Sequence, residues 1–143
     1  MKKKKLKKHS IMTTTKQFDD FKRHVLKWID FFGLKEWKIF FYQRNILDHN
    51  GNGGHFAGLN WDVVHHACSF FFALELDEDD FKMLEIERHA FHEVCHLLLA
   101  NLHETAMRRY TTLEDIEKST EYIIRTLENT LFLQSKKKRK KSK

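Results

Sequence analysis

Apolar residues recur early in the chain at the three- and four-residue steps of an amphipathic helix. Between residues 17 and 32 these positions are Phe18, Phe21, Val25, Leu26, Ile29 and Phe32. Gly33 follows directly and is a typical helix stop, because glycine adopts the left-handed conformation without strain. The pattern predicts a helix over residues 17–32 that buries one face.

The next part of the chain has the composition of strands. Trp37–Arg44 is rich in aromatic and β-branched residues, and two further strands are predicted near His55–Trp61 and His65–Leu76. The last of these is apolar on both faces for much of its length, so we expect it to be covered. Between the first two, Asp48–Gly54 has the Asn and Gly content of a loop.

Helical patterns fill the second half of the chain. Asp77–Asp80 supplies carboxylates that favour the positive end of a helix, and we expect this helix to run from Phe81 to about Ala106. A break is predicted at Arg108–Thr112, followed by a last helix over about 113–133. The predicted fold class is therefore α+β, with an N-terminal helix, a small three-stranded sheet and two long helices.

The net charge of +6 is distributed unevenly. Residues 1–9 carry six Lys and residues 136–143 carry six Lys and one Arg, which leaves 13 basic against 20 acidic residues between them, a balance of −7. Like-charge blocks repel themselves and stay solvated, so residues 1–16 and 135–143 are expected to be disordered basic tails around a domain over 17–134. Weak contact with nucleic acid is the function that such tails would add.

The sequence also predicts the environment of the protein. No stretch reaches the roughly 18 apolar residues of a membrane span, and no apolar signal-peptide core follows the first lysines. A cytoplasmic protein without a membrane partner is expected. The two cysteines, Cys68 and Cys95, lack the spacing of a disulfide framework and are expected to be free thiols, with a single disulfide left open.

The clearest chemical signal is the segment His92-Glu93-Val94-Cys95-His96. On a helix, a four-residue spacing places the two imidazoles on one face about one turn apart, within reach of one Zn²⁺ at about 2.0–2.1 Å. Glu93 follows His92 directly, where its carboxylate is suited to take a proton from a zinc-bound water as general base. The segment predicts one zinc ion bound by His92 and His96, with Glu93 as the catalytic residue.

Catalytic zinc usually has three protein ligands, so a third is needed here. His103 would stand about 10.5 Å from His96 along a continuous helix, too far for the same ion, and no histidine follows it. The candidates are therefore acids of the last helix. In an antiparallel helix pair turning near residues 109–110, Glu121 lies nearest to His96, Glu128 is the alternative third ligand, and Glu117 comes after both.

This combination resembles the gluzincin branch of zinc metallopeptidases, above all its very small members, the minigluzincins, and small phage or bacterial metallopeptidases. The likeness covers about residues 17–133. It implies a zincin-like minimal domain, in which a small twisted sheet packs on the active-site helix, with His92, His96 and Glu121 as ligands and Glu93 as general base. Larger gluzincins carry Asn-Glu-x-x-Ser-Asp at the third ligand. This chain has Thr120-Glu121-Tyr-Ile-Ile-Arg125 instead, so the Asp that orients a ligand histidine is missing.

The predicted function is zinc-dependent hydrolysis of peptide bonds in a peptide or protein substrate. Two alternatives stay open: a catalytically silent zincin-like protein that binds zinc or a partner, and a protein tethered to nucleic acid by its basic tails. For the hydrolase, Tyr110, Tyr122 and Arg125 are the candidates for stabilising the oxyanion of a tetrahedral intermediate.

Overall fold

The computed structural model describes residues 10–46, 55–107, 110, 112–132 and 136. The predictions for the basic ends 1–9 and 137–143, for the loop at 48–54 and for most of the break at 108–112 lie outside these residues. Within them the chain is a mixed α+β structure, as predicted, with helices and two small sheets. No helix in this part of the chain is both long and apolar enough to cross a membrane.

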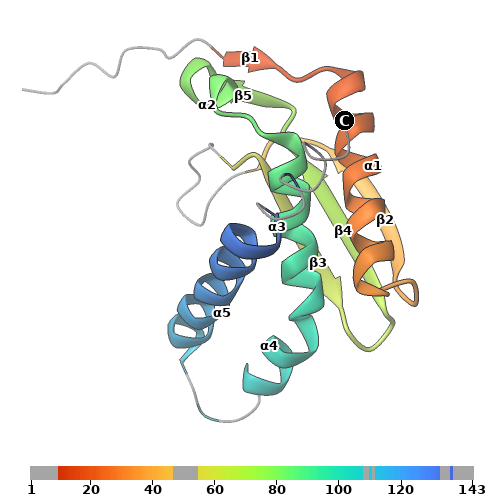
Figure 1. Cartoon of the computed structure of the whole chain (residues 1–143), viewed down its shortest axis with the longest axis vertical. Helices are drawn as coiled ribbons and strands as arrows, with labels where there is room; N and C mark the ends of the chain where they lie inside the picture. The colour runs from red at the N-terminus through yellow and green to blue at the C-terminus, as the bar shows by residue number, and fades with distance from the viewer. Residues whose placement is uncertain (1–9, 47–54, 108–109, 111, 133–135, 137–143) are drawn as a thin grey trace, which may run out of the picture.

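The larger of the two sheets has three strands (Figure 1). Its strand order is β2 (Lys38–Gln43), β4 (Ala67–Phe72) and β3 (Ala57–Asp62), with β4 parallel to β2 and antiparallel to β3. These are the three strands predicted from composition; β2 and β4 are shorter than predicted at both ends, and β3 starts later but extends one residue further, to Asp62. Central β4 is largely buried, as its two apolar faces led us to expect, and β3 is left at one edge of the sheet.

Helix α1 (Thr15–Phe32) packs on this sheet. Thr14 caps it, since its hydroxyl accepts a hydrogen bond from the Gln17 backbone N–H while the Gln17 side chain accepts one from the Thr14 N–H. The helix stops at Gly33, which has a left-handed φ of 69°. The predicted apolar face is correct except at Leu26, which is exposed, whereas Trp28 is buried.

The single helix predicted from Phe81 to Ala106 is wrong, because the chain forms three helices there. These are α2 (Glu78–Lys82), α3 (Ile86–Leu98) and α4 (Ala100–Met107). The Met83 N–H donates to the carbonyls of Asp79 and Asp80, which closes α2, and the chain is extended at Glu85 before α3 begins. Only Leu99 separates α3 from α4, so these two nearly continue each other.

A two-stranded sheet of β1 (Ser10–Met12) and β5 (Glu75–Asp77) was not predicted. It corrects the domain boundary, because residues 10–16 were assigned to a disordered tail and instead form this strand and the start of α1. Thr13 fixes the junction: its buried hydroxyl donates to the Ala73 carbonyl at 2.5 Å.

Helix α5 (Leu113–Leu127) lies beside α3 on the side away from α1 (Figure 1). It continues as a π-helical turn, η1 (Glu128–Phe132), where the sequence predicted a regular helix to residue 133. The hydrophobic core lies between α1, α3 and the sheet, with Phe21 stacked on Phe72 and Trp28 against Phe91. Both cysteines, Cys68 and Cys95, are free and buried in this core, as expected for free thiols.

Candidate metal centre

Helix α3 positions the two histidines by burying its other faces. Phe91, Val94 and Cys95 are fully buried in the core. His92 and His96 stand one turn apart on the side that faces α5, and each keeps about a quarter or less of its side chain exposed. The pair is therefore held rigidly by core packing while its ring nitrogens remain accessible.

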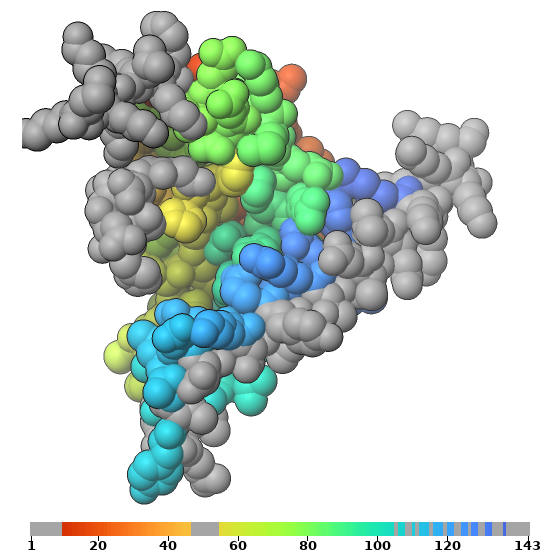
Figure 2. All heavy atoms as spheres, turned by 90° about the vertical axis from the view of Figure 1, so that its left-hand side faces the viewer, coloured from red at the N-terminus to blue at the C-terminus, as the bar shows by residue number. Residues whose placement is uncertain are grey.

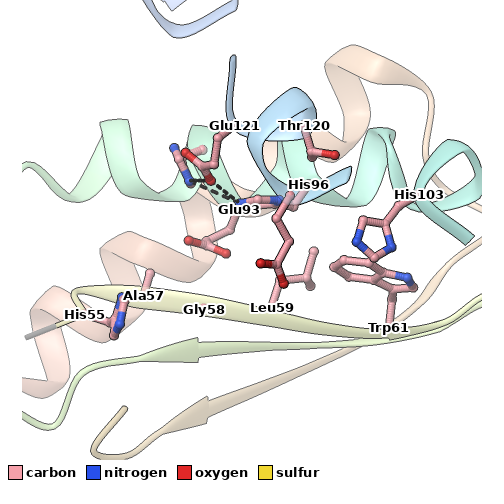
Figure 3. Close-up of a pocket in the computed structure, with 12 residues that line it drawn as sticks. His55, Ala57, Gly58, Leu59, Trp61, Glu93, His96, His103, Thr120 and Glu121 are labelled. Carbon is pink, nitrogen blue, oxygen red and sulfur yellow. Dashed lines mark hydrogen bonds and ion pairs between the residues drawn. The ribbon is translucent and has the colours of Figure 1, made fainter. Parts of the chain in front are cut away.

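Glu121 of α5 completes a triangle with these histidines (Figure 3). The two Nε2 atoms of His92 and His96 lie 3.2 Å apart. The Oε1 atom of Glu121 lies 3.6 Å from Nε2 of His92 and 3.4 Å from Nε2 of His96. The structure thus brings together the three residues that were selected from the sequence, although Glu121 follows His96 by 25 positions.

The size of this triangle fits a small tetrahedral ion. Nitrogen and oxygen ligands at about 2.0–2.1 Å from Zn²⁺ in tetrahedral geometry stand about 3.3–3.4 Å from one another. The three observed edges, 3.2, 3.4 and 3.6 Å, bracket that value. Two imidazoles and one carboxylate also form a donor set suited to zinc, and three protein ligands leave a fourth position open.

Glu93 lies in the same cavity as the triangle. Figure 3 shows its side chain extending from α3 toward β3. Only 8% of the residue is exposed, and this burial raises the pKa of its carboxyl to about 7, against the partial opposing effect of His92 and with a contribution from the negative charge of Glu121. A carboxyl that titrates near neutral pH is suited to accept and return a proton.

Glu128 lies on the other side of His92. Its Oε2 atom is 3.9 Å from Nδ1 of His92, the ring nitrogen that faces away from the triangle, and its Oε1 atom accepts a hydrogen bond of 2.8 Å from Nε of Arg88. Burial alone would raise the pKa of Glu128, but these two partners outweigh it and lower the pKa to about 2. The alternative third ligand is thus placed where a carboxylate orients a ligand histidine.

Glu128 and the negative charges of the site also act on the histidines. Burial lowers the pKa of His92, but the carboxylate of Glu128 near Nδ1 and the charges of Glu93 and Glu121 more than compensate, so the net shift is upward. At His96 burial dominates, and with the charge of His92 it lowers the pKa to about 4. His96 is therefore neutral, the state that binds a metal, at any pH near 7.

A cavity of about 540 Å³ opens beside the triangle. The edge strand β3 forms one wall with Ala57, Gly58, Leu59 and Trp61, α5 forms the facing wall, and α3 lies between them. Figure 2 views this face, with the side chains of β3 on one side and those of α5 on the other. The cavity is a cleft that runs along the edge of the sheet and passes the three candidate ligands.

Two of the three residues predicted to stabilise an oxyanion, Tyr110 and Arg125, do not line this cavity. Tyr110 is fully exposed and Arg125 extends into solvent, with its Nε atom 3.6 Å from Oε2 of Glu121. Neither lines the cleft among the described residues. The side chain of Tyr122 lies outside the part that the structure describes.

Sequence reasoning missed two residues of the cleft wall, His103 and Trp61. His103 was set aside as too distant to bind the metal, but it lines the cavity from α4 with its ring edge-on to Trp61 at 5.3 Å between centroids. The signal was present, because seven residues is two helical turns and places His103 on the face of His96. Trp61 carried no signal beyond its place at the end of a predicted strand.

Comparisons of this chain with protein-family models, with curated proteins and with solved structures find no match. The chemistry of the site therefore rests on its own residues and their geometry.

Proposed function

We propose that this protein is a zinc-dependent metallopeptidase with a zincin-like fold, in which His92, His96 and Glu121 hold one zinc ion. The observation that carries the proposal is the triangle of Nε2, Nε2 and Oε1 atoms with edges of 3.2–3.6 Å. Its donor set and open fourth position are those of a catalytic zinc site. The bound ion would supply Lewis-acid polarisation of a water and of a substrate carbonyl.

Glu93 performs the proton transfers in this proposal. Its carboxylate lies inside the cavity, and its pKa of about 7 lets it accept the proton of the attacking water at neutral pH. The protonated carboxyl then donates that proton to the departing amine. Burial makes this possible, because the carboxylate of a solvated Glu with an ordinary pKa would be a weaker base toward the attacking water at neutral pH.

The edge of β3 that faces the cleft favours a peptide as the substrate. On one side β3 pairs with β4, and among the described residues no strand pairs with its other edge, which faces the cleft. An extended peptide can add to such an edge through backbone hydrogen bonds. This would lay the peptide alongside the triangle with the scissile carbonyl near the open position.

Elemental analysis of purified protein tests the metal site first. After reconstitution, we expect one zinc per chain in the wild type and in Glu114→Ala, an exposed α5 acid outside the cleft that pairs with Lys118. We expect His96→Ala and Glu121→Ala to lose it. A wild type that binds no zinc in excess metal would overturn the proposal.

A peptide-library digest read by mass spectrometry tests catalysis. The zinc-loaded wild type should cleave peptides, and zinc-loaded Glu93→Gln, which keeps the shape of the side chain without its acid–base chemistry, should be slower by at least about a hundredfold. Equal turnover by both proteins would mean that the zinc is not catalytic in this way and would favour the catalytically silent alternative.

A further inference from the structure

Three side chains gather at one end of the cleft, away from the general base. Trp61 is the last but one residue of β3, and His103 belongs to α4. Glu117 lies one helical turn before Glu121 on α5. All three line the same cavity as the candidate metal ligands. In Figure 3 the rings of Trp61 and His103 lie together beyond His96, and His55 and Ala57 mark the opposite end. The cleft thus has two chemically different ends.

Glu117 is the acid at this end of the cleft, and within the part of the chain that the structure describes its carboxylate has no ion-pair partner. It is exposed, and no described residue forms an ion pair or side-chain hydrogen bond with it. Its neighbours on α5 are engaged otherwise: Glu114 pairs with Lys118, and Glu121 faces the two histidines and Arg125. A carboxylate therefore lines the same cavity as the indole ring of Trp61.

At the opposite end the charges are matched. A second hollow, of about 460 Å³, continues the cleft past His92 and contains Glu85, Arg88 and Glu128. Arg88 donates to Glu128 at 2.8 Å, and Glu85 pairs with Lys136 at 2.7 Å. Among the described residues, Glu85 and Glu128 at this end thus have cationic partners, whereas Glu117 on the Trp61 side has none.

We propose that Trp61, His103 and Glu117 form a binding subsite for a Lys or Arg side chain of the substrate, so that the protein acts on basic peptides. This rests on the proposed peptidase function. The carboxylate of Glu117 neutralises the cation, and the indole of Trp61 offers an aromatic face, which attracts a cation through its ring quadrupole. The acidic balance of residues 10–135, −7, favours the same class of substrate at longer range.

The position of the subsite sets where the basic residue stands. Glu117 is about 6 Å from Glu121 along α5, since four residues rise about 1.5 Å each. An extended peptide advances about 3.3 Å per residue. The basic side chain is therefore expected one to three residues from the scissile bond, and on one side of it only.

Matched quenched-fluorescence peptides test the proposal. They differ only by Lys, Gln or Glu at one position, scanned three residues to each side of the scissile bond, and each is assayed with zinc-loaded wild type, Glu117→Gln, Glu117→Lys and the control Glu114→Gln. We expect the wild type and the control to prefer Lys over Glu by about tenfold in kcat/KM at one position. Glu117→Gln should lose most of this preference, Glu117→Lys should invert it, and added salt should weaken it.

Binding of the same labelled peptides to zinc-loaded Glu93→Gln, by fluorescence anisotropy, separates this inference from the proposed function. A Lys preference in binding that depends on Glu117, without cleavage by the wild type, would support the subsite and reject the peptidase. Cleavage without a charge preference, or with a preference that Glu117→Gln keeps, would reject the subsite and leave the peptidase intact. Absence of binding to the Lys, Gln and Glu peptides alike would also reject the subsite.

Discussion

The carboxylate of Glu128 lies between two side chains of α3, Arg88 and His92. The sequence placed Glu117, Glu121 and Glu128 on one helix face and could rank them only by assuming where the helix pair turns. Glu121 and Glu128 meet different atoms of His92. Glu121 lies near Nε2, whereas Glu128 faces Nδ1 from the π-helical turn. A helical period carries no information on which ring nitrogen an acid meets.

Replacement of Glu128 by Gln tests its role at the proposed metal site. The change removes the charge that holds the His92 ring, so we expect zinc affinity to fall by about 10- to 100-fold, with one zinc still bound at saturation. Competition with a chromogenic chelator measures this affinity, and Glu114→Gln is the control. A variant that binds no zinc even at saturation would show instead that Glu128 is itself a ligand.

The raised pKa of Glu93 predicts how the stability of the metal-free protein depends on pH. This folded pKa of about 7 lies above the ordinary value of 4.5. The unfolded chain therefore loses this proton first, and the free energy of unfolding falls as pH rises from about 4.5 to 7. Glu93→Gln removes that decrease, and in chelator the variant should be more stable than wild type above pH 7, by about 3 kcal/mol.

Thermal or denaturant unfolding at several pH values measures this difference. The low pKa of His96 gives an opposite slope at acid pH that both proteins share, so the difference between them reports Glu93 together with its effect on His92. At pH 4 the two proteins should be equally stable. A constant difference across the whole pH range would contradict the raised pKa.

At the scale of elements, the strong periodic patterns were reliable and the short ones were not. The long helix α1 and the three strands of the main sheet were predicted within a few residues. Strands β1 and β5 span three residues each, too short for any alternation to show. The break at Met83–Glu85 was missed because each of these residues is compatible with a helix, and the Met83 N–H that closes α2 leaves no signal in the sequence.

The N-terminal cap of α1 gives a prediction at this scale. Thr14→Ala removes the hydroxyl that accepts the Gln17 N–H, and we expect the free energy of unfolding to fall by about 1 kcal/mol. Because the cap is remote from the triangle, the loss should be the same with and without zinc, and Thr15→Ala, at the next and exposed position, should cost less. Denaturant titrations measure it; a loss that appears only without zinc would contradict this independence.

At the scale of the whole molecule, the proposed metal would join parts of the chain that the core joins only loosely. His92 and His96 belong to α3, which is buried along much of its length in the core, whereas α5 reaches the core through Ile124 and contributes Glu121. A ligand that binds only the folded state stabilises it by about 2.7 kcal/mol at a hundred times its Kd. The expected effect of zinc is thus a gain in stability centred on α5.

Hydrogen exchange followed by mass spectrometry measures this gain by segment. Zinc should slow exchange in α5 more than in α1, and should raise the Tm of wild type but not of His96→Ala. Uniform slowing in α1 and α5, or the same rise in Tm for His96→Ala, would mean that zinc acts elsewhere on the molecule.

Alkylation of the two buried thiols can report how often the hydrophobic core opens. Burial raises the pKa of both Cys68 and Cys95 to about 12, so at pH 7 only about one thiol in 10⁵ is ionised in the folded state. Alkylating reagents attack the thiolate, and they therefore modify molecules whose core has opened. Cys95 lies between Glu93 and His96, so the rate at which it is alkylated records how often the helix that carries the histidines leaves the core, in a protein that needs no added label.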